Sequence, residues 1–375
     1  MRINENRLLD TFVKLVSIDS PSYREREMCE ELKARLENLG LDVEEDDSAV
    51  RSGSNCGNLI AKLPGTVDIP PILFSCHMDT VAPAYGKKAI IHDDGTITSA
   101  GDTILGADDL SGVSAILEAL QVIQQEKIPH GPIEVVFTTC EEVYGKGVEN
   151  LDMEKLAAKE AYILDLTGPT GRAAKRAPTI ISFEATINGR ASHAGFGPEK
   201  GIHSIQIASR AISKLQFGRI DPGTTVNIGT IHGGLATNIV PESCTVKGEV
   251  RSFNHAKALE ETQRILAVFC QEAEQIGATA TTSYRVCIKA YEMEESCGAV
   301  QRFRKACDTL GLETILDETF GGSDLNVFAD RGLDGLVLSC AMEQCHSCKE
   351  NTTVAELCRI AELTLTLMTT DAEMI

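Results

Sequence analysis

The chain has 375 residues, and 43% of them are hydrophobic, which is ordinary for a globular protein. One simple core rarely serves a chain of this length, so we expect two domains, or one large domain with another inserted into it. The formal net charge of −20 disfavours nucleic acid and anionic membranes as partners, because a negative surface repels phosphate groups. No apolar run reaches the roughly 18 residues that a membrane helix requires.

Cysteine usage indicates the compartment. The chain has 13 cysteines, an odd number, and they are spread over its whole length instead of being concentrated in a small scaffold. The residues after Met1 also lack the apolar core of a signal peptide. We therefore expect reduced thiols and a cytoplasmic location.

Strands and helices alternate in the two outer parts of the chain, residues 1–177 and 292–375. Periodicity and turn residues predict helices over 6–16, about 22–39 (ended by Gly40), 109–125, 297–310 and 354–369, and strands over 58–63, 72–76, 133–139, 161–164 and 336–340. This alternation predicts an α/β domain in which helices sandwich a mixed sheet.

The middle of the chain, residues 178–291, has a different order. We expect strands over 180–187, 225–231, 244–251 and 279–288, and helices over 201–215 and 255–275. This is the β-α-β-β-α-β order of a ferredoxin-like α+β unit. It predicts a compact domain inserted into the α/β domain.

His77 and Asp79 stand at the end of an apolar strand. Strand side chains alternate, so these two share a face, and the carboxylate can orient the imidazole as it does for many metal ligands. The alternative is a buried histidine in an ion pair.

Asp108 and Asp109 directly precede a predicted helix, after a loop between Gly101 and Gly106. Two acids at a helix start can simply cap it and favour its dipole. The glycines favour a ligand role, because they let a carboxylate approach a cation closely.

Glu141 and Glu142 follow a very apolar strand. Adjacent carboxylates at the end of a buried strand repel each other and lose hydration, so they favour a cation or a proton nearby. One can bind metal while the other acts as general base. A solvated loop is the alternative.

Asp165 ends the next predicted strand, and His346 follows the last one. Sites in open α/β sheets collect at the carboxyl edge, where these residues fall. Two histidines with several carboxylates suit zinc, with cobalt or manganese as alternatives. Cys345 and Cys348 flank His346, but a single Cys-x-x-Cys pair is more typical of incidental thiols than of a zinc ribbon or a redox pair.

The chain resembles the co-catalytic dizinc peptidase family that includes peptidase T, aminoacylase and bacterial glutamate carboxypeptidase. The matching segments run in family order over nearly the whole chain: His77-Met-Asp-Thr80, Gly106-Ala-Asp-Asp109, Glu141-Glu142, Asp165, Ser192-His-Ala-Gly195, Asn238-Ile-Val-Pro241, Gly321-Gly-Ser-Asp324 and His346. Residues 103–109 and Pro198-Glu-Lys-Gly201 resemble the peptidase T branch most.

The resemblance implies a zinc-peptidase-like catalytic domain over 1–177 and 292–375. It also implies that His77 and Asp165 bind one Zn²⁺, that Glu142 and His346 bind a second, and that Asp108 bridges the two. Asp79 would orient His77, and Glu141 would activate the water that bridges the metals. A cis peptide bond between Asp108 and Asp109 is implied as well.

Residues 178–291 resemble the family's lid and dimerisation domain, which implies a homodimer through the lid. His193, Asn238 and Arg251 match positions that hold substrate or stabilise the oxyanion in relatives. From their residue types alone, a capped turn, a loop amide and a surface ion pair are the alternatives.

Three functional hypotheses follow. The first is a zinc-dependent aminopeptidase or tripeptidase that acts on small peptides. The second is a carboxypeptidase or N-acyl amino acid amidohydrolase with the same metal pair. The third, a non-catalytic dimer that binds peptides, is disfavoured because Glu141 and all five expected ligands are present.

Overall fold

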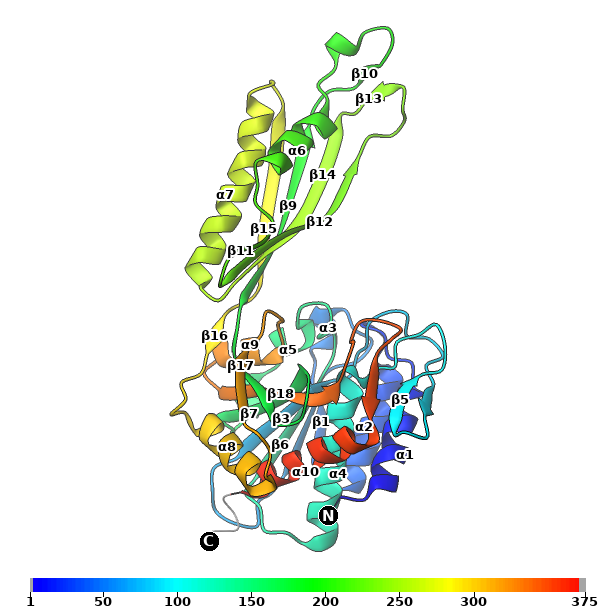
Figure 1. Ribbon diagram of the computed structural model, residues 1–375, viewed down its shortest axis with the longest axis vertical. Coiled ribbons are helices and arrows are strands. Elements are labelled where there is room, and N and C mark those ends of the chain that lie inside the picture. The colour runs from blue at the N-terminus through cyan, green and yellow to red at the C-terminus, as the bar shows by residue number, and fades with distance from the viewer. Residues whose placement is uncertain (1–2, 371–375) are drawn as a thin grey trace. The chain divides into compact units, whose positions relative to one another are not determined.

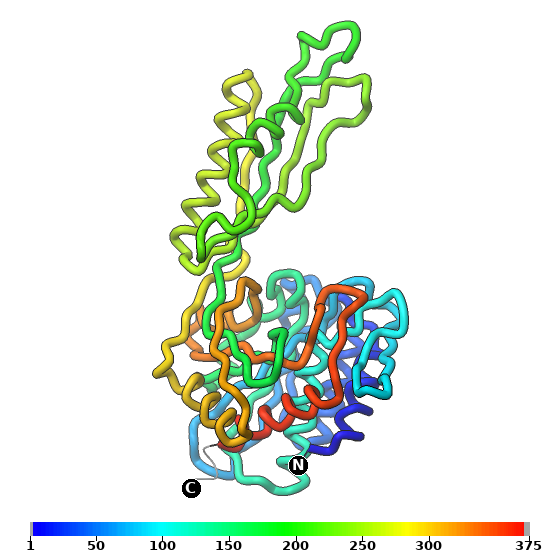
Figure 2. Tube along the Cα trace, viewed as in Figure 1, coloured from blue at the N-terminus to red at the C-terminus, as the bar shows by residue number. Residues whose placement is uncertain are grey.

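The chain forms two compact units in the computed structural model, which describes residues 3–370. Unit 1 comprises Met1–Arg176, Glu292–Thr319 and Ser323–Ile375, and unit 2 comprises Ala177–Tyr291 and Phe320–Gly322. Figure 2 shows unit 2 as the green to yellow part of the trace, formed by the middle of the chain. Among the described residues, no helix is long and apolar enough to cross a membrane.

Unit 1 is built on a mixed sheet, which has nine strands within residues 3–370. Its order is β1-β2-β6-β3-β7-β18-β8-β16, and β17 pairs with β8. The strands are β1 Asp42–Glu45, β2 Leu59–Leu63, β3 Ile72–His77, β6 Ile133–Thr138, β7 Glu160–Thr167, β8 Arg172–Ala177, β16 Tyr291–Glu292, β17 Ile315–Glu318 and β18 Asp334–Met342. A separate small sheet joins β4 Ala89–Ile91, β5 Thr96–Ser99 and β19 Asn351–Thr353.

The centre of the large sheet is parallel. Strand β3 pairs in parallel with β6 and β7, and β18 pairs in parallel with β7. Every residue of β3 and β6 is buried, which explains why most of their residues are apolar. Because parallel strands run in one direction, the segments that follow these four strands meet at one edge of the sheet.

Helices cover this sheet. They are α1 Glu5–Val16, α2 Arg26–Asn38, α3 Ala49–Ser52, α4 Ala107–Glu126, α5 Lys146–Glu149, α8 Gly298–Leu310, α9 Asp324–Asp330 and α10 Val354–Thr369, with a 3₁₀ turn at Met153–Lys155. Helix α4 packs against β3, β7 and β18 and in turn contacts α1 and α10 (Figure 1). All but a few of its residues are buried, so it is the central helix of the unit.

Unit 2 is an antiparallel sheet with two helices packed on it (Figure 1). The sheet order is β11-β12-β14-β9-β15. Its elements are β9 Thr179–Asn188, β10 Ser192–His193, a 3₁₀ turn at Pro198–Lys200, α6 Ser204–Ser213, β11 Gly218–Asp221, β12 Thr224–Gly233, β13 Ile239–Val240, β14 Ser243–Ser252, α7 His255–Glu274 and β15 Thr279–Ile288. Apolar residues of the sheet and both helices form its core, among them Phe183, Ile207, Val246 and Phe269.

The predicted fold class, an α/β domain with a ferredoxin-like insertion, is confirmed. Several boundaries were wrong. The helix expected over 201–215 is shorter, Ser204–Ser213, and the strand expected over 336–340 is longer, Asp334–Met342. The helix expected from residue 22 begins at Arg26, because the preceding segment is a turn in which Tyr23 has a φ of 73° and donates its N–H to Glu25. Strand β7 does not end at Asp165 but continues to Thr167. Short elements were not predicted, because short segments carry little periodicity. They are the strands β1, β4, β5, β8, β10, β11, β13, β16, β17 and β19 and the helices α3, α5 and α9.

Candidate metal centre

His77 ends the central strand β3, and its side chain is 1% exposed. Its Nδ1 lies 2.8 Å from the backbone oxygen of Asp79, which can only accept, so Nδ1 carries the proton. The other nitrogen, Nε2, is therefore the one directed at Asp108 Oδ1, 3.0 Å away. Asp79 therefore orients the His77 ring, as expected from the sequence, but it does so through its backbone carbonyl. Its nearest carboxylate oxygen is 3.7 Å from the ring nitrogen.

The Asp79 carboxylate instead holds the turn that carries the two glutamates. Its Oδ1 accepts the backbone N–H of Glu141 at 2.9 Å, and its Oδ2 accepts that of Glu142 at 3.2 Å and the hydroxyl of Ser22 at 2.7 Å. Strand β6 ends just before this turn, so no regular structure satisfies these N–H groups. The Asp79 carboxylate accepts these hydrogen bonds instead and fixes the backbone position of Glu141 and Glu142.

Asp108 lies at the start of α4, in a segment with non-helical backbone angles. The peptide bond between Asp108 and Asp109 is cis, as the family resemblance implied. One carboxylate oxygen of Asp108 faces His77, and the other, Oδ2, lies 3.2 Å from Nε2 of His346. Asp108 therefore stands between the two histidines.

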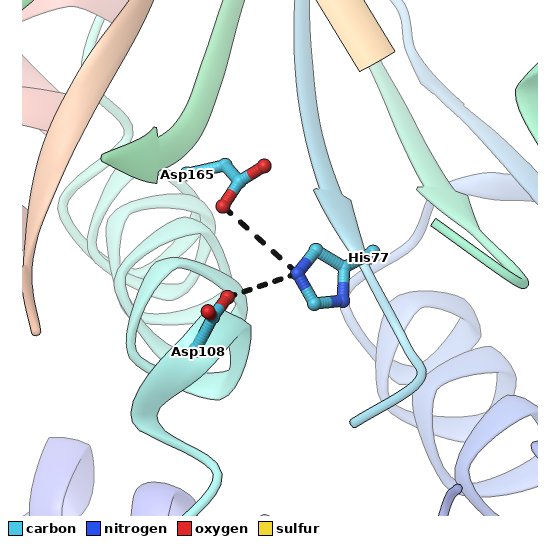
Figure 3. A group of neighbouring side chains, drawn as sticks. All are labelled: His77, Asp108 and Asp165. Carbon is cyan, nitrogen blue, oxygen red and sulfur yellow. Dashed lines mark hydrogen bonds and ion pairs between the residues drawn. The ribbon is translucent and has the colours of Figure 1, made fainter. Parts of the chain in front are cut away.

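Asp165 lies within β7 at an irregular point of its pairing with β18. The register shifts between Val337 and Ser339 of β18, opposite the stretch that contains Asp165. Such bulges re-aim side chains. The Asp165 carboxylate is directed at His77, with 4.0 Å between its Oδ1 and Nε2 of the histidine (Figure 3).

His346 belongs to the loop between β18 and β19, and its side chain is 58% exposed. Its Nε2 lies 3.1 Å from Glu142 Oε2 as well as 3.2 Å from Asp108. His346 has a positive φ of 61°, an unusual conformation for a non-glycine residue and one often found at functional sites.

Five predicted ligands thus form two groups that share one residue. The ligand atoms of His77, Asp108 and Asp165 lie within 4.8 Å of one another, and so do those of Asp108, Glu142 and His346. Figure 3 shows the first group, in which both carboxylates point toward the imidazole. This arrangement offers two adjacent nitrogen and oxygen sites with a common aspartate.

The clustered carboxylates of this site favour bound cations, as the pKa shifts of its residues indicate. Burial raises the pKa of Asp165 well above its ordinary value, and the carboxylates of Glu141 and Asp108 raise it further. Burial likewise raises the pKa of Glu141 well above its ordinary value. Hydrogen bonds to Asp108 and Glu142 raise the pKa of His346 to about 10. In the absence of a metal, the protonated imidazole therefore supplies the positive charge beside these carboxylates.

The donor set fits a metal pair. Oε1 of Glu142 is buried and has no hydrogen-bond partner within residues 3–370, although its other oxygen faces His346. A buried carboxylate oxygen without a partner is costly unless a cation compensates it. Two imidazoles and three carboxylates are the ligand types that zinc accepts. The cluster thus has the donors and the spacing to hold metal.

The three predicted lid residues all lie in unit 2, but in different places. His193 and Asn238 are neighbours in the loops joined by β10 and β13, where Ala194 N–H donates to the Asn238 carbonyl at 3.0 Å. Arg251 lies near the opposite end of β14, where it contacts Glu249 and donates to the Phe320 carbonyl, each at 2.8 Å. The structure therefore does not bring Arg251 together with the other two.

Several supporting residues were missed by the sequence analysis. Buried Glu25 accepts the backbone N–H of Cys140 at 3.0 Å, and buried Glu350 accepts that of Asp108 at 2.8 Å. Asp324 accepts the hydroxyl of Thr138 at 2.5 Å. Glu25 and Glu350 bind backbone groups, which leave no mark on the sequence, whereas Asp324 stood in a segment that resembled the family.

Solved structures and a curated relative match the chain over nearly its full length. A tripeptidase from Staphylococcus aureus subsp. aureus mu50 is 35% identical, with a TM-score of 0.96 and coverage of 100% of both chains. The aminopeptidase PepT from Bacillus cereus ATCC 10987 is 38% identical, with a TM-score of 0.90 and coverage of 98% of this chain and 99% of that one. The uncharacterized protein YqjE of Bacillus subtilis strain 168 is 39% identical over 366 residues, 98% of each chain.

Two family models match parts of the chain. Residues 58–195 match a model described as peptidase family M28, and residues 177–277 match one described as a peptidase dimerisation domain of the M20 type. With the metal-binding cluster, these matches define the class, a metallo-exopeptidase that carries a dimerisation domain. More narrowly, the chain belongs to the peptidase T-like branch of the M20 metallopeptidase family, which confirms the resemblance found in the sequence.

Proposed function

We propose that this enzyme removes residues from the amino end of small peptides, tripeptides above all, with unit 1 as catalytic domain and unit 2 as lid and dimerisation domain. The observation that carries the proposal is the position of Asp108, which lies in both ligand groups beside the turn of Glu141. The full-length similarity to a tripeptidase and an aminopeptidase supports the choice of substrate.

His77, Asp108 and Asp165 would hold one metal ion, and Asp108, Glu142 and His346 the other. Zinc is the metal we propose, with cobalt or manganese as alternatives, because the donors are imidazole and carboxylate. When bound, such a pair polarises the scissile carbonyl and lowers the pKa of the attacking water.

Glu141 would be the general base. It is absent from both ligand groups, so its carboxylate is free to take a proton from the attacking water and deliver it to the leaving amine. Its raised pKa suits a residue that must hold a proton between these steps. Asp79 would aid it by holding its backbone in place.

His193 and Asn238 would contact the substrate. Nδ1 of His193 accepts the backbone N–H groups of Gly195 at 3.0 Å and Phe196 at 3.2 Å. The ring is therefore a tautomer whose Nε2 carries the proton and can donate to a carbonyl oxygen or a carboxylate. We propose the same for Arg251, although its present partners are Glu249 and Phe320.

A homodimer through unit 2 is part of the proposal. Among the described residues, the part of β12 from 227 to 233 pairs with β14 alone, so one edge of that stretch is open. Open strand edges readily pair with another chain. The match to a dimerisation domain over residues 177–277 supports this assembly. We also propose a cytoplasmic location, supported by the 13 free cysteines.

The test is the release of amino acids from a panel of tripeptides, with and without a chelator. We expect cleavage of peptides with a free amino group, abolished by the chelator and restored by Zn²⁺. N-acetylated peptides and N-acyl amino acids serve as controls. Chelator-insensitive cleavage would reject the proposal, and preference for the blocked substrates would replace it with an amidohydrolase or carboxypeptidase activity.

A further inference from the structure

One buried carboxylate reaches the backbone of the loop that carries Asp108. Glu350 is 1% exposed, and its Oε2 accepts the N–H of Gly106 at 2.7 Å while its Oε1 accepts the N–H of Asp108 at 2.8 Å. The two donors are separated by 242–244 residues in sequence from Glu350. Gly106 and Asp108 lie at the start of α4, where the backbone angles are not helical and the N–H groups have no partner within the helix. Each oxygen of Glu350 thus fixes one peptide group of this segment.

The same residue closes the loop that carries His346. The backbone N–H of Glu350 donates to the Ser347 carbonyl at 3.0 Å. At the base of this loop, Glu343 and Asn351 exchange two backbone hydrogen bonds, at 2.9 Å and 3.0 Å. The loop contains no helix or strand between β18 and β19, so local turns and the side chain of Glu350 determine where His346 lies.

Lys87 also lies close to Gly106. Its buried ammonium donates to the Ile18 carbonyl at 3.0 Å and to the Thr80 hydroxyl at 3.3 Å. A Cβ atom on Gly106 would lie 3.3 Å from the Cε atom of Lys87. Gly106 thus lies near both the lysine and the carboxylate of Glu350, whose charges attract each other.

We infer that Glu350 is a positioning residue that holds the Asp108 loop and the His346 loop together, and that it thereby sets the metal affinity of the group formed by Asp108, Glu142 and His346. Asp108 Oδ2 and His346 Nε2 are 3.2 Å apart, so a small shift of either loop changes that group. The other group shares Asp108, but its remaining ligands, His77 and Asp165, come from the strands β3 and β7, so it depends less on Glu350. This inference rests on the proposed function, because it assumes two metal ions.

The test is Glu350→Gln, which keeps the size of the side chain but replaces one accepting oxygen with an NH₂ group that faces a backbone donor. Metal-free protein is titrated with Zn²⁺ against a chromophoric chelator. Wild type should bind two ions. The variant should bind the first with wild-type affinity and the second about 10- to 100-fold more weakly, and excess Zn²⁺ should restore its turnover. Equal affinities in variant and wild type, or equal weakening of both sites, would overturn the inference.

Glu350→Asp tests the same point if the glutamine variant does not fold. The shorter carboxylate keeps the charge but reaches one N–H group instead of two, so we expect the same selective loss at a smaller size. Glu343→Gln is the matched control, since Glu343 lies on the same loop with an exposed side chain. Failure of the proposed function is distinguishable. Without a metal pair, wild type itself would bind fewer than two ions, and a different substrate class would show in the tripeptide panel while the Zn²⁺ titration stayed the same.

Discussion

Asp79 accepts the backbone N–H of Glu141 through Oδ1 at 2.9 Å, although its sequence position suggested a carboxylate directed at His77. The acid thus links the first ligand strand to the proposed general base. It holds His77 by its carbonyl and the glutamate turn by its carboxylate. One residue therefore aligns two parts of the site that lie more than 60 residues apart in sequence.

Asp79→Asn should lower kcat about 10- to 100-fold, the usual effect of removing a residue that orients a metal site. The amide offers one accepting oxygen for the three donors from Ser22, Glu141 and Glu142. Steady-state kinetics on a cleaved tripeptide measures the change, with metal content determined in parallel. Unchanged kcat at full metal content would show that the turn holds its position without the carboxylate.

Glu141→Gln should lower kcat by about 10²- to 10⁴-fold, the range of general acid–base catalysis, while the metal stays bound. The reason is that Glu141 belongs to neither ligand group. Elemental analysis of the purified variant and its turnover of a tripeptide are the two measurements. Loss of metal together with activity would instead make Glu141 a ligand.

Removing the metal should lower the Tm by roughly 5 °C. Binding to the folded state alone adds about 2.7 kcal/mol when the free metal is at 100 times its Kd, and each kcal/mol shifts the Tm of a large domain by about 2 °C or more. The carboxylates of Asp108, which is buried, and of Glu142 and Asp165, which are half-buried, would lose their compensating charge. Thermal scans with a chelator and with added Zn²⁺ measure the shift, which should be absent in a variant with Asp108→Ala.

The free energy of unfolding should depend on pH through the titration of Lys87. Burial lowers the pKa of Lys87 to about 8 from an ordinary value of 10.5. Between these values the unfolded chain keeps a proton that the folded chain has released, so folding stability contributed by this group rises with pH. Below about 8 the folded state bears the full cost of a buried ammonium.

Lys87→Met removes this titration. The unfolding free energy of wild type minus that of the variant should increase by about 3 kcal/mol from pH 8 to pH 10.5. Urea unfolding in the presence of chelator measures it. Lys88→Met, at the exposed neighbouring position, should show no such trend. A flat difference for Lys87 would mean that the ammonium keeps its ordinary pKa.

His193→Ala should lower kcat about 100-fold without loss of metal or thermal stability, the effect of removing one donor to a developing oxyanion. His193 lies in unit 2 with an exposed side chain, so its loss removes no core packing. His232→Ala is the control, because His232 is also exposed in unit 2. Equal kinetics of the two variants would exclude the proposed contact.

Much of the fold was accessible from the sequence because burial leaves periodic patterns. The alternation of strands and helices predicted a mixed sheet between helices, and the order of elements in 178–291 predicted the inserted unit. Residues at strand ends, such as His77 and Glu142, could be proposed as ligands because parallel strands bring their ends to one edge. Their side chains, an imidazole and a carboxylate, are ligand types that zinc accepts.

The tertiary structure alone decided which atoms meet. It directs the two oxygens of Asp108 toward His77 and His346, turns the Asp79 carboxylate to the glutamate turn, and brings Glu350 to the backbone of Asp108. The last two contacts involve peptide N–H groups, which every residue except proline carries, so no pattern of side chains reveals them. The sequence thus determined the kind of chemistry, and the folded chain determined its geometry.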